Sequence, residues 1–336
     1  MPRTITATAP CRVDLAGGTL DIWPLYLFHP GALTVNFAVN LLARCSVRSL
    51  GGRQVVLRSI DTGREERFPS LDALRRARRY RHPLAAYLLR HFTPRSGILL
   101  ETHSESPAGA GISGSSALLV AACAALARST GHRIARQQMR VLVQNVEAQI
   151  IGVPTGCQDY YPALYGGISA IALGVNGIAR RAIRLPAAEL DARFLLAYTG
   201  APRKSGINNW KVFQEHINGN RQVFRNFEHI ARLARHMRDA LAAADWESVG
   251  RLMREEWQYR KRNAPRISTA KIDDLVAVAL RQGARGAKVC GAGGGGCVVF
   301  LIEPDARKRV ARALAGSGAR LLPARVARRG LRVTES

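Results

Sequence analysis

Glycines and serines are concentrated in residues 107–116, and an apolar run over residues 117–127 follows directly. Small residues let a backbone turn tightly around an anion, and the unpaired N–H groups at a helix start point toward that anion. Ser115 and Ser116 could cap the helix or supply a hydroxyl to a phosphate-bound Mg²⁺. The segment lacks the lysine that a P-loop requires. It therefore predicts a phosphate-binding loop of another kind, with a plain glycine-rich turn as the alternative.

Two carboxylates further along the chain could also do chemistry. Glu147 lies on the same predicted helical face as Val143 and Ile150. A buried carboxylate is costly without a partner, so we expect either Mg²⁺ or an arginine beside it. Asp159 falls in a turn-rich segment, residues 152–167, where a carboxylate can position an alcohol and accept its proton. An Asx turn or a helix cap is the alternative role for Asp159.

Two more segments place glycines beside residues that could contact a ligand. Residues 9–21, APCRVDLAGGTLD, predict a strand, then Gly17 and Gly18, then Asp21; Arg12 taken alone is expected at the surface. The tract GAGGGG, residues 291–296, lies between a predicted helix and a predicted strand. Because the residues on both sides of this tract look buried, it indicates close approach of the backbone to a ligand or to another loop.

The elements that must position these residues form a mixed pattern without regular βαβ alternation, which favours an α+β fold. Gly51-Gly52 predicts a hairpin between the apolar runs on either side of it. We expect a domain boundary near residue 185, which gives domains 1–185 and 186–336. Strands are expected over residues 32–39, 41–50, 53–59, 98–102, 168–173, 194–198 and 297–302. Helices are expected over residues 71–92 with an interruption at Pro83, 117–127, 139–151, 207–244 with a break at Gly219, 248–262 and 273–282.

Composition limits the class of protein. The chain has 336 residues, enough for two domains, and its net charge of +26 favours anionic partners. The basic clusters are short and lack interleaved aromatic residues, so nucleic acid is an unlikely partner, and biased arginine usage is the favoured explanation of the charge. The six cysteines form no C-x-x-C pair, which is typical of free thiols in a reducing compartment. With no apolar run long enough for a membrane span and no signal-peptide pattern, we expect a cytoplasmic protein without a membrane partner.

Three segments in this order resemble the motifs of the GHMP kinase superfamily: APCRVDLAGGTLD, PAGAGISGSSA and KVCGAGGGGCVVFL. The resemblance spans nearly the whole chain, and the second motif is highly specific. Within the superfamily, the chain is most similar to bacterial D-glycero-D-manno-heptose 7-phosphate kinases. This closer likeness rests on RVDLAGGTLD, GCQDYYPALYGG, YTGAPRKSGI and EEWQYRKRNAPRIS.

The resemblance implies an N-terminal domain with a βαβ crossover of unusual hand, a ferredoxin-like C-terminal domain, and an ATP site between them. It implies that Asp159 is the catalytic aspartate with Arg12 beside it, and that Ser116 and Glu147 contact Mg²⁺. The implied ATP-binding residues are Pro107, Gly109, Ala110, Gly111, Ser113, Gly114, Ser115 and Ser116. The implied substrate-binding residues are Gly17, Gly18, Asp21, Arg203, Gly293 and Gly294.

The resemblance also implies the reaction: transfer of the ATP γ-phosphoryl group to a hydroxyl of a sugar or sugar phosphate. The anomeric hydroxyl of a heptose 7-phosphate is the expected acceptor, and Arg203 and Lys204 could meet the phosphate it already carries. Galactokinases have Glu-His where this chain has Gly18-Thr19, which disfavours galactose. The alternatives are a kinase for fucose, arabinose, galactose or a mevalonate-like alcohol, and a nucleic-acid-binding protein on a kinase-like scaffold.

Overall fold

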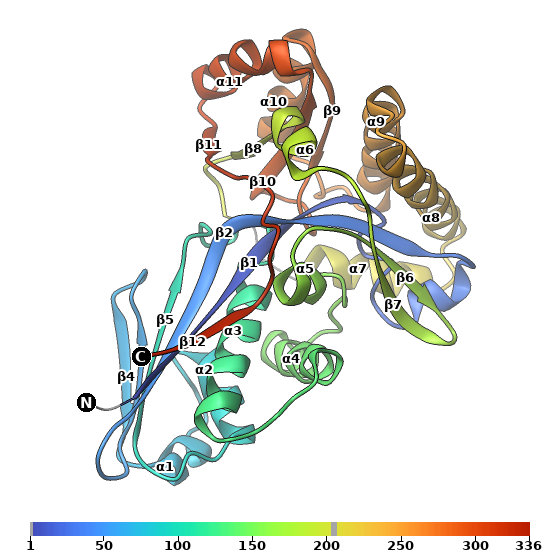
Figure 1. The fold of residues 1–336 in the computed structure, drawn as a ribbon. Coiled ribbons are helices and arrows are strands. Elements are labelled where there is room, and N and C mark those ends of the chain that lie inside the picture. The colour runs from blue at the N-terminus through green and yellow to red at the C-terminus, as the bar shows by residue number, and fades with distance from the viewer. Residues whose placement is uncertain (1–2, 203–206) are drawn as a thin grey trace.

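The computed structural model describes residues 3–202 and 207–336, and it contains two β-sheets with helices packed against them (Figure 1). The larger sheet lies in the lower half of Figure 1, and the smaller one forms the upper lobe. Strands and helices are mixed along the chain, which confirms the predicted α+β class. The predicted boundary at residue 185 stays a prediction.

The larger sheet has eight strands and is organised around the long strand β2, which pairs with β1, β5 and β6. The last strand of the chain, β12, pairs with β1, so the C-terminus returns to the sheet in which the chain began. The strands are β1 (Thr4–Ala16), β2 (Leu33–Ser49), β3 (Val55–Ser59), β4 (Arg64–Phe68), β5 (Ile98–Ser104), β6 (Ile168–Gly174), β7 (Gly177–Ala182) and β12 (Arg332–Glu335).

The hairpin predicted at Gly51-Gly52 is wrong. β5 lies between the two strands that the hairpin was expected to join, antiparallel to β2 and parallel to β3. Gly97, just before β5, fits against the turn, because a Cβ there would lie 2.7 Å from the carbonyl oxygen of Gln54. The local pattern of two apolar runs and a turn cannot reveal a partner strand that comes about forty residues later.

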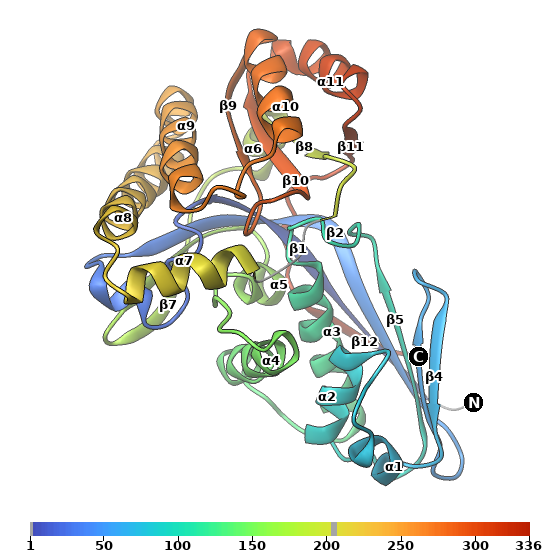
Figure 2. The ribbon, with the colours of Figure 1, turned by 180° about the vertical axis from the view of Figure 1, so that it is seen from behind.

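Helices of the larger domain gather on one face of its sheet, as Figures 1 and 2 both show for α2, α3 and α4. α3 is buried along most of its length, as its apolar sequence predicts. The expected helix over 71–92 is two helices, and Pro83 occupies the first turn of the second one, where proline is tolerated. These helices are α1 (Leu71–Arg76), α2 (Pro83–His91), α3 (Gly114–Ser129), α4 (Arg136–Ile151) and α5 (Tyr160–Tyr165); a 3₁₀ turn, η1 (Leu25–Phe28), follows β1.

The smaller sheet has the strand order β11-β8-β10-β9 and is antiparallel throughout. Taken along the chain, its elements run strand, helices, two strands, helix, strand, which confirms the predicted ferredoxin-like arrangement. Its strands are β8 (Phe194–Tyr198), β9 (Ala284–Val289), β10 (Cys297–Ile302) and β11 (Arg320–Leu322). Its helices are α6 (Ala187–Arg193), α7 (Ile207–Ile217), α8 (Arg221–Ala242), α9 (Trp246–Asn263), α10 (Ala270–Arg281) and α11 (Arg307–Gly316), with a 3₁₀ turn η2 (Pro304–Ala306).

A buried histidine pair fixes α7 to the larger domain. Nε2 of His29, just after η1, lies 2.8 Å from Nε2 of His216, near the end of α7. Burial and the neighbouring His216 lower the pKa of His29 to about 4, so both rings are neutral near pH 7 and one donates to the other. The pair anchors the helix that carries Asn209 toward the site described below.

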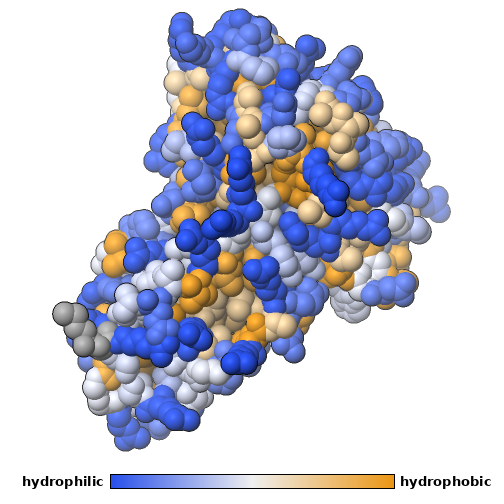
Figure 3. Space-filling model, in the orientation of Figure 1, coloured by the Kyte–Doolittle hydropathy of each residue, from blue (hydrophilic) through white to orange (hydrophobic). Residues whose placement is uncertain are grey.

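Hydrophilic side chains are spread over the face shown in Figure 3, and hydrophobic side chains are visible between them near its middle. None of the helices in the described ranges is long and apolar enough to cross a membrane. All six cysteines are buried.

Candidate active site

The glycine-serine segment forms a loop between β5 and the start of α3, as its sequence predicts. Gly109 and Gly111 have φ values of +67° and +77°, a left-handed conformation that favours glycine. The loop is held from both domains, because Arg12 N–H donates to the Ile112 carbonyl and Cys297 N–H donates to the Ala110 carbonyl. It lines a cavity of about 390 Å³ between the domains. The loop residues on this cavity include Pro107, Gly109, Ala110, Gly111, Ser113, Gly114 and Ser115.

Glu147 belongs to α4, and its buried side chain contacts the first turn of α3. It accepts hydrogen bonds from Ser115 Oγ at 2.7 Å, Ser116 Oγ at 2.8 Å and Tyr160 Oη at 2.6 Å. Burial raises the pKa of Glu147. The arginine partner that the sequence left open is not among its contacts in the described part of the chain.

Ser115, Ser116 and Glu147 fit a magnesium ion whose coordination is completed by phosphate oxygens of a substrate. Among the described residues, no group of three or more His, Cys, Asp or Glu side chains could hold a metal alone. Mg²⁺ is usually bound by one or two carboxylates together with phosphate oxygens, so a full protein cage is not expected. Glu147 and Ser115 line the cavity, and Ser116 is not part of its lining. A buried carboxylate beside two hydroxyls has the oxygen chemistry that Mg²⁺ prefers.

Asp159 forms an ion pair with Arg12. The Arg12 Nε and Nη2 atoms lie 2.8 Å and 2.7 Å from Asp159 Oδ1, and Arg12 Nη1 donates to the Gly111 carbonyl at 2.8 Å. Arg12 is buried, so the surface position expected for it from sequence alone is wrong. Asp159 precedes α5 but makes no side-chain capping bond, which leaves its carboxylate to Arg12 and the cavity. Burial opposes the charge of Arg12, but Asp159 and Asp14 outweigh it and raise the pKa of Arg12.

A second, smaller cavity lies beyond Asp159. Its lining includes Thr19, Asp21, Gln158 and Asn209, whose side chains are all polar. Asp21 is buried and accepts hydrogen bonds from the Gln158 backbone N–H at 2.9 Å and the Gln158 side chain at 3.3 Å. Burial and the charge of Asp159 raise the pKa of Asp21 to about 6. Thr155, Asp159, Asn209 and Ala292 line both cavities, so the two cavities adjoin at Asp159.

The glycines predicted to bind substrate differ in how close they lie to the smaller cavity. A Cβ at Gly17 would lie 2.1 Å from the Leu33 carbonyl oxygen, so Gly17 permits close packing of β1 and β2. Gly18 lies against Arg260, and Gly291 lines the smaller cavity. Gly293 and Gly294 contact Ile267 instead, and the Gly294 N–H donates to its carbonyl; their predicted substrate contact stays a prediction. Arg203 and Lys204 lie outside the described residues.

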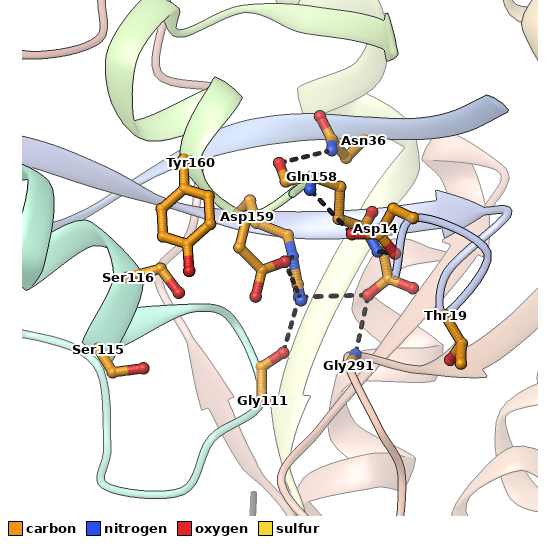
Figure 4. A network of polar contacts seen from close by, with 12 residues as sticks. Asp14, Thr19, Asn36, Gly111, Ser115, Ser116, Gln158, Asp159, Tyr160 and Gly291 are labelled. Carbon is orange, nitrogen blue, oxygen red and sulfur yellow. Dashed lines mark hydrogen bonds and ion pairs between the residues drawn. The ribbon is translucent and has the colours of Figure 1, made fainter. Parts of the chain in front are cut away.

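Four polar or charged residues at the site were not predicted from the sequence. Asp14 lies two residues after Arg12 on β1, and Lys288 lies on β9, just before the glycine tract 291–296. Both are buried. Arg260 and Asn209 line the smaller cavity from α9 and α7. The position of Asp14 between the buried residues Val13 and Leu15 was an available signal. In Figure 4, Asp159 lies between Ser115, Ser116 and Tyr160 on one side and Asp14 and Gly291 on the other.

The fold and the site define a class: a two-domain α+β protein whose cleft holds a glycine-serine loop at a helix start, a buried carboxylate and an arginine-paired aspartate. The sequence profile of the GHMP kinases N terminal domain matches residues 78–167, and that of the GHMP kinases C terminal region matches residues 237–320. Together the two matches cover about half of the chain, one in each half. The chain belongs to the GHMP kinase family.

Individual relatives share about a quarter of their residues with this chain. A D-glycero-alpha-D-manno-heptose 7-phosphate kinase of Campylobacter jejuni is 26% identical over 325 residues, which are 93% of this chain and 93% of that protein. A galactokinase of Mycobacterium bovis is 27% identical over 249 residues, 65% of this chain and 68% of that protein.

Solved structures share the fold. A D-glycero-D-manno-heptose 1-phosphate kinase from Bacteroides thetaiotaomicron aligns with a TM-score of 0.79 and 22% identity, covering 98% of each chain. A Lactococcus lactis galactokinase complexed with galactose aligns with a TM-score of 0.81 and 18% identity, covering 98% of this chain and 95% of that one. At these identities the likeness shows the fold alone.

Proposed function

We propose that this protein is an ATP- and Mg²⁺-dependent kinase that transfers the γ-phosphoryl group to a hydroxyl of a sugar or sugar phosphate. The proposed acceptor hydroxyl is the anomeric one of D-glycero-D-manno-heptose 7-phosphate. The observation that carries the proposal is the position of Asp159, which lines both the cavity of the glycine-serine loop and the smaller polar cavity. A donor in the first cavity and an acceptor in the second would meet at this carboxylate.

The larger cavity suits a nucleoside triphosphate. Its glycine-serine loop leads into the N-terminus of α3, a 16-residue helix whose first N–H groups and positive dipole end favour phosphate oxygens. Its other wall includes Leu84, Leu118 and Ile150, which offer an apolar surface to a base. Ser116 and Glu147 would hold the ion, and Mg²⁺ bound there would neutralise charge on the β- and γ-phosphate oxygens.

The residues of this chain have distinct roles in the proposed transfer. Asp159 accepts the proton of the acceptor hydroxyl while that oxygen bonds to the γ-phosphorus, and the bond from the phosphorus to the departing ADP oxygen breaks. Arg12 fixes the orientation of Asp159 and places positive charge beside the transferred group. The buried loop backbone of Gly111 is tied to Arg12, so loop and aspartate are held together.

The polar lining of the smaller cavity offers hydrogen-bond partners to the hydroxyls of an acceptor, and the structure at Gly18 disfavours the glutamate that galactokinases carry there. A Cβ at Gly18 would lie 2.5 Å from Arg260 Nη1 and 3.3 Å from Asp14 Oδ2, so a glutamate there would displace the buried Arg260. The Campylobacter heptose 7-phosphate kinase, matched along 93% of this chain, supports a phosphorylated heptose. Arg203 and Lys204 are the cations we propose for its phosphate.

Acceptor binding should depend on the charge of Asp21. A carboxylate accepts hydrogen bonds from sugar hydroxyls better than a carboxylic acid does, and the pKa of Asp21 is raised to about 6. As the pH falls through 6, Asp21 becomes protonated. We therefore expect kcat/KM for the acceptor to decrease, with a limiting slope of about tenfold per pH unit. Asp21→Asn should lower kcat/KM at pH 8 and remove this acid limb. A profile that keeps the same limb in Asp21→Asn would assign it to another group.

A coupled ADP-release screen over free sugars and sugar phosphates tests the proposed reaction, with phosphorus NMR of the product to locate the new phosphate. We expect turnover with heptose 7-phosphate and a new anomeric phosphate signal. Turnover with a free hexose but none with heptose 7-phosphate would refute the acceptor and retain the kinase. No Mg²⁺-dependent ADP release with any acceptor, including mevalonate, would refute the kinase.

A further inference from the structure

A buried charge cluster joins the three glycine-containing segments, and most of it has no role in the function proposed above. Its centre is Asp14, which is fully buried on β1. Asp14 Oδ1 accepts from the Gly291 N–H at 2.9 Å and lies 3.3 Å from Arg12 Nη1. Asp14 Oδ2 lies 3.0 Å from Lys288 Nζ and 3.3 Å from Arg260 Nη1. One carboxylate therefore contacts groups from both domains.

The cluster continues away from the cleft through the C-terminal domain. Lys288 Nζ lies 3.2 Å from Glu256 Oε1, and Arg260 Nη2 donates to the Gly291 carbonyl at 2.7 Å. With Arg12 and Asp159, the cluster comprises the three cations Arg12, Arg260 and Lys288 and the three carboxylates Asp14, Asp159 and Glu256. Charges this deeply buried are tolerated when they are paired with opposite charges, as these are, although Glu256 Oε2 has no hydrogen-bond partner among the described residues.

The geometry at Arg12 shows what Asp14 does for the site. The planar guanidinium is held on one edge by Asp159, and on its remaining nitrogen, Nη1, by Asp14 and the Gly111 carbonyl. Because the guanidinium is rigid, fixing Nη1 also fixes the direction of the edge that faces Asp159. In Figure 4, Asp14 and Gly291 lie to the right of Asp159, and Gly111 lies below it. The three cations hold the pKa of Asp14 well below its usual range despite its burial, so it stays ionised.

We propose, on the basis of the phosphotransfer proposed above, that Asp14 is a positioning residue for the Arg12–Asp159 pair. Asp14 keeps Arg12 directed at Asp159, and its bond from the Gly291 N–H makes that direction depend on the third glycine-rich segment. Lys288 supports this role by balancing the charge of Asp14 from the opposite side of the cluster.

Kinetics of two variants test this proposal. Asp14→Asn removes the charge and leaves excess buried cations, so it should lower both the melting temperature and kcat. The double variant Asp14→Asn/Lys288→Met restores the charge balance and leaves Glu256 with Arg260, 3.8 Å away, so it should recover part of the stability. We expect its kcat to remain about 100-fold below that of the wild type, the scale expected for a misplaced catalytic group, with KM for ATP within about threefold. A double variant that recovers both stability and kcat would overturn the proposal.

Glu256→Gln is the matched control, because Glu256 contacts the same lysine but lies outside both cavities and makes no bond to Arg12. It should lower the melting temperature while kcat stays within about threefold of the wild type. Equal losses of kcat in Glu256→Gln and Asp14→Asn would mean that Asp14 is merely structural.

A crystal structure of the double variant tests the inference without turnover. We expect Arg12 to have left Asp159 or to have rotated about it, and an unmoved Arg12 would overturn the positioning role. If the wild type transfers no phosphate to any acceptor, the proposed function fails, while this comparison of Arg12 still decides what Asp14 does.

Discussion

Replacing Asp159 with asparagine should lower kcat by between about 100- and 10 000-fold, the range expected when a general base is removed. The amide keeps the size of the side chain but cannot accept the acceptor proton, and it weakens the ion pair with Arg12. Binding of ATP should change little, because the glycine-serine loop and Glu147 remain. Steady-state assays with saturating ATP and acceptor give kcat. Calorimetry with a non-hydrolysable ATP analogue gives the dissociation constant of that analogue.

Asp191→Asn provides the control for this substitution. Asp191 is a partly buried carboxylate that accepts a bond from the Val326 N–H and lies outside both cavities. Its substitution should leave kcat close to that of the wild type. A near wild-type kcat in Asp159→Asn would remove Asp159 from the mechanism, and loss of analogue binding would show that it holds the nucleotide instead.

Changes at the Glu147 group should raise the Mg²⁺ concentration needed for half-maximal activity. We expect Glu147→Gln and Ser116→Ala each to raise it by at least about tenfold, since loss of even an outer-shell partner weakens metal binding about 10- to 100-fold. Binding of ADP titrated with and without Mg²⁺ measures the same effect without turnover. The physical reason is loss of a hard oxygen ligand from a site that carries few of them.

Ser115→Ala separates a ligand role from a packing role. Ser115 and Ser116 both donate to Glu147, at 2.7 Å and 2.8 Å, so either alanine removes one bond to the carboxylate. We expect a metal contact from Ser116 alone, so the shift in Ser115→Ala should be clearly smaller. Equal shifts in the two variants, or an unchanged Mg²⁺ titration in Glu147→Gln, would contradict the assignment.

Much of the fold was predictable because it rests on local patterns. The buried run after the glycine-serine loop forms α3, the helical spacing up to Ile151 forms α4, and the break at Gly219 separates α7 from α8. The ferredoxin-like order of the C-terminal domain followed from the resemblance and is confirmed. The insertion of β5 beside β2 was not predictable from local sequence, because strand pairing depends on contacts between distant segments.

The candidate site was partly predictable for the same reason. The resemblance selected Arg12, Glu147 and Asp159, and the structure brings Arg12 and Asp159 into contact, although their roles stay predictions. Lys288 and Arg260 were missed because, in a chain with 50 lysines and arginines, nothing local distinguishes a buried cation from a surface one. Their burial depends on Asp14 and Glu256, which come from different elements.

The most direct test of the central claim is a crystal structure with a non-hydrolysable ATP analogue and Mg²⁺. We expect the triphosphate over residues 107–116, an ion in contact with Ser116 and Glu147, and the terminal phosphate facing Asp159 and Arg12. A nucleotide bound elsewhere, or a glycine-serine loop that stays closed against protein at saturating analogue, would contradict the account.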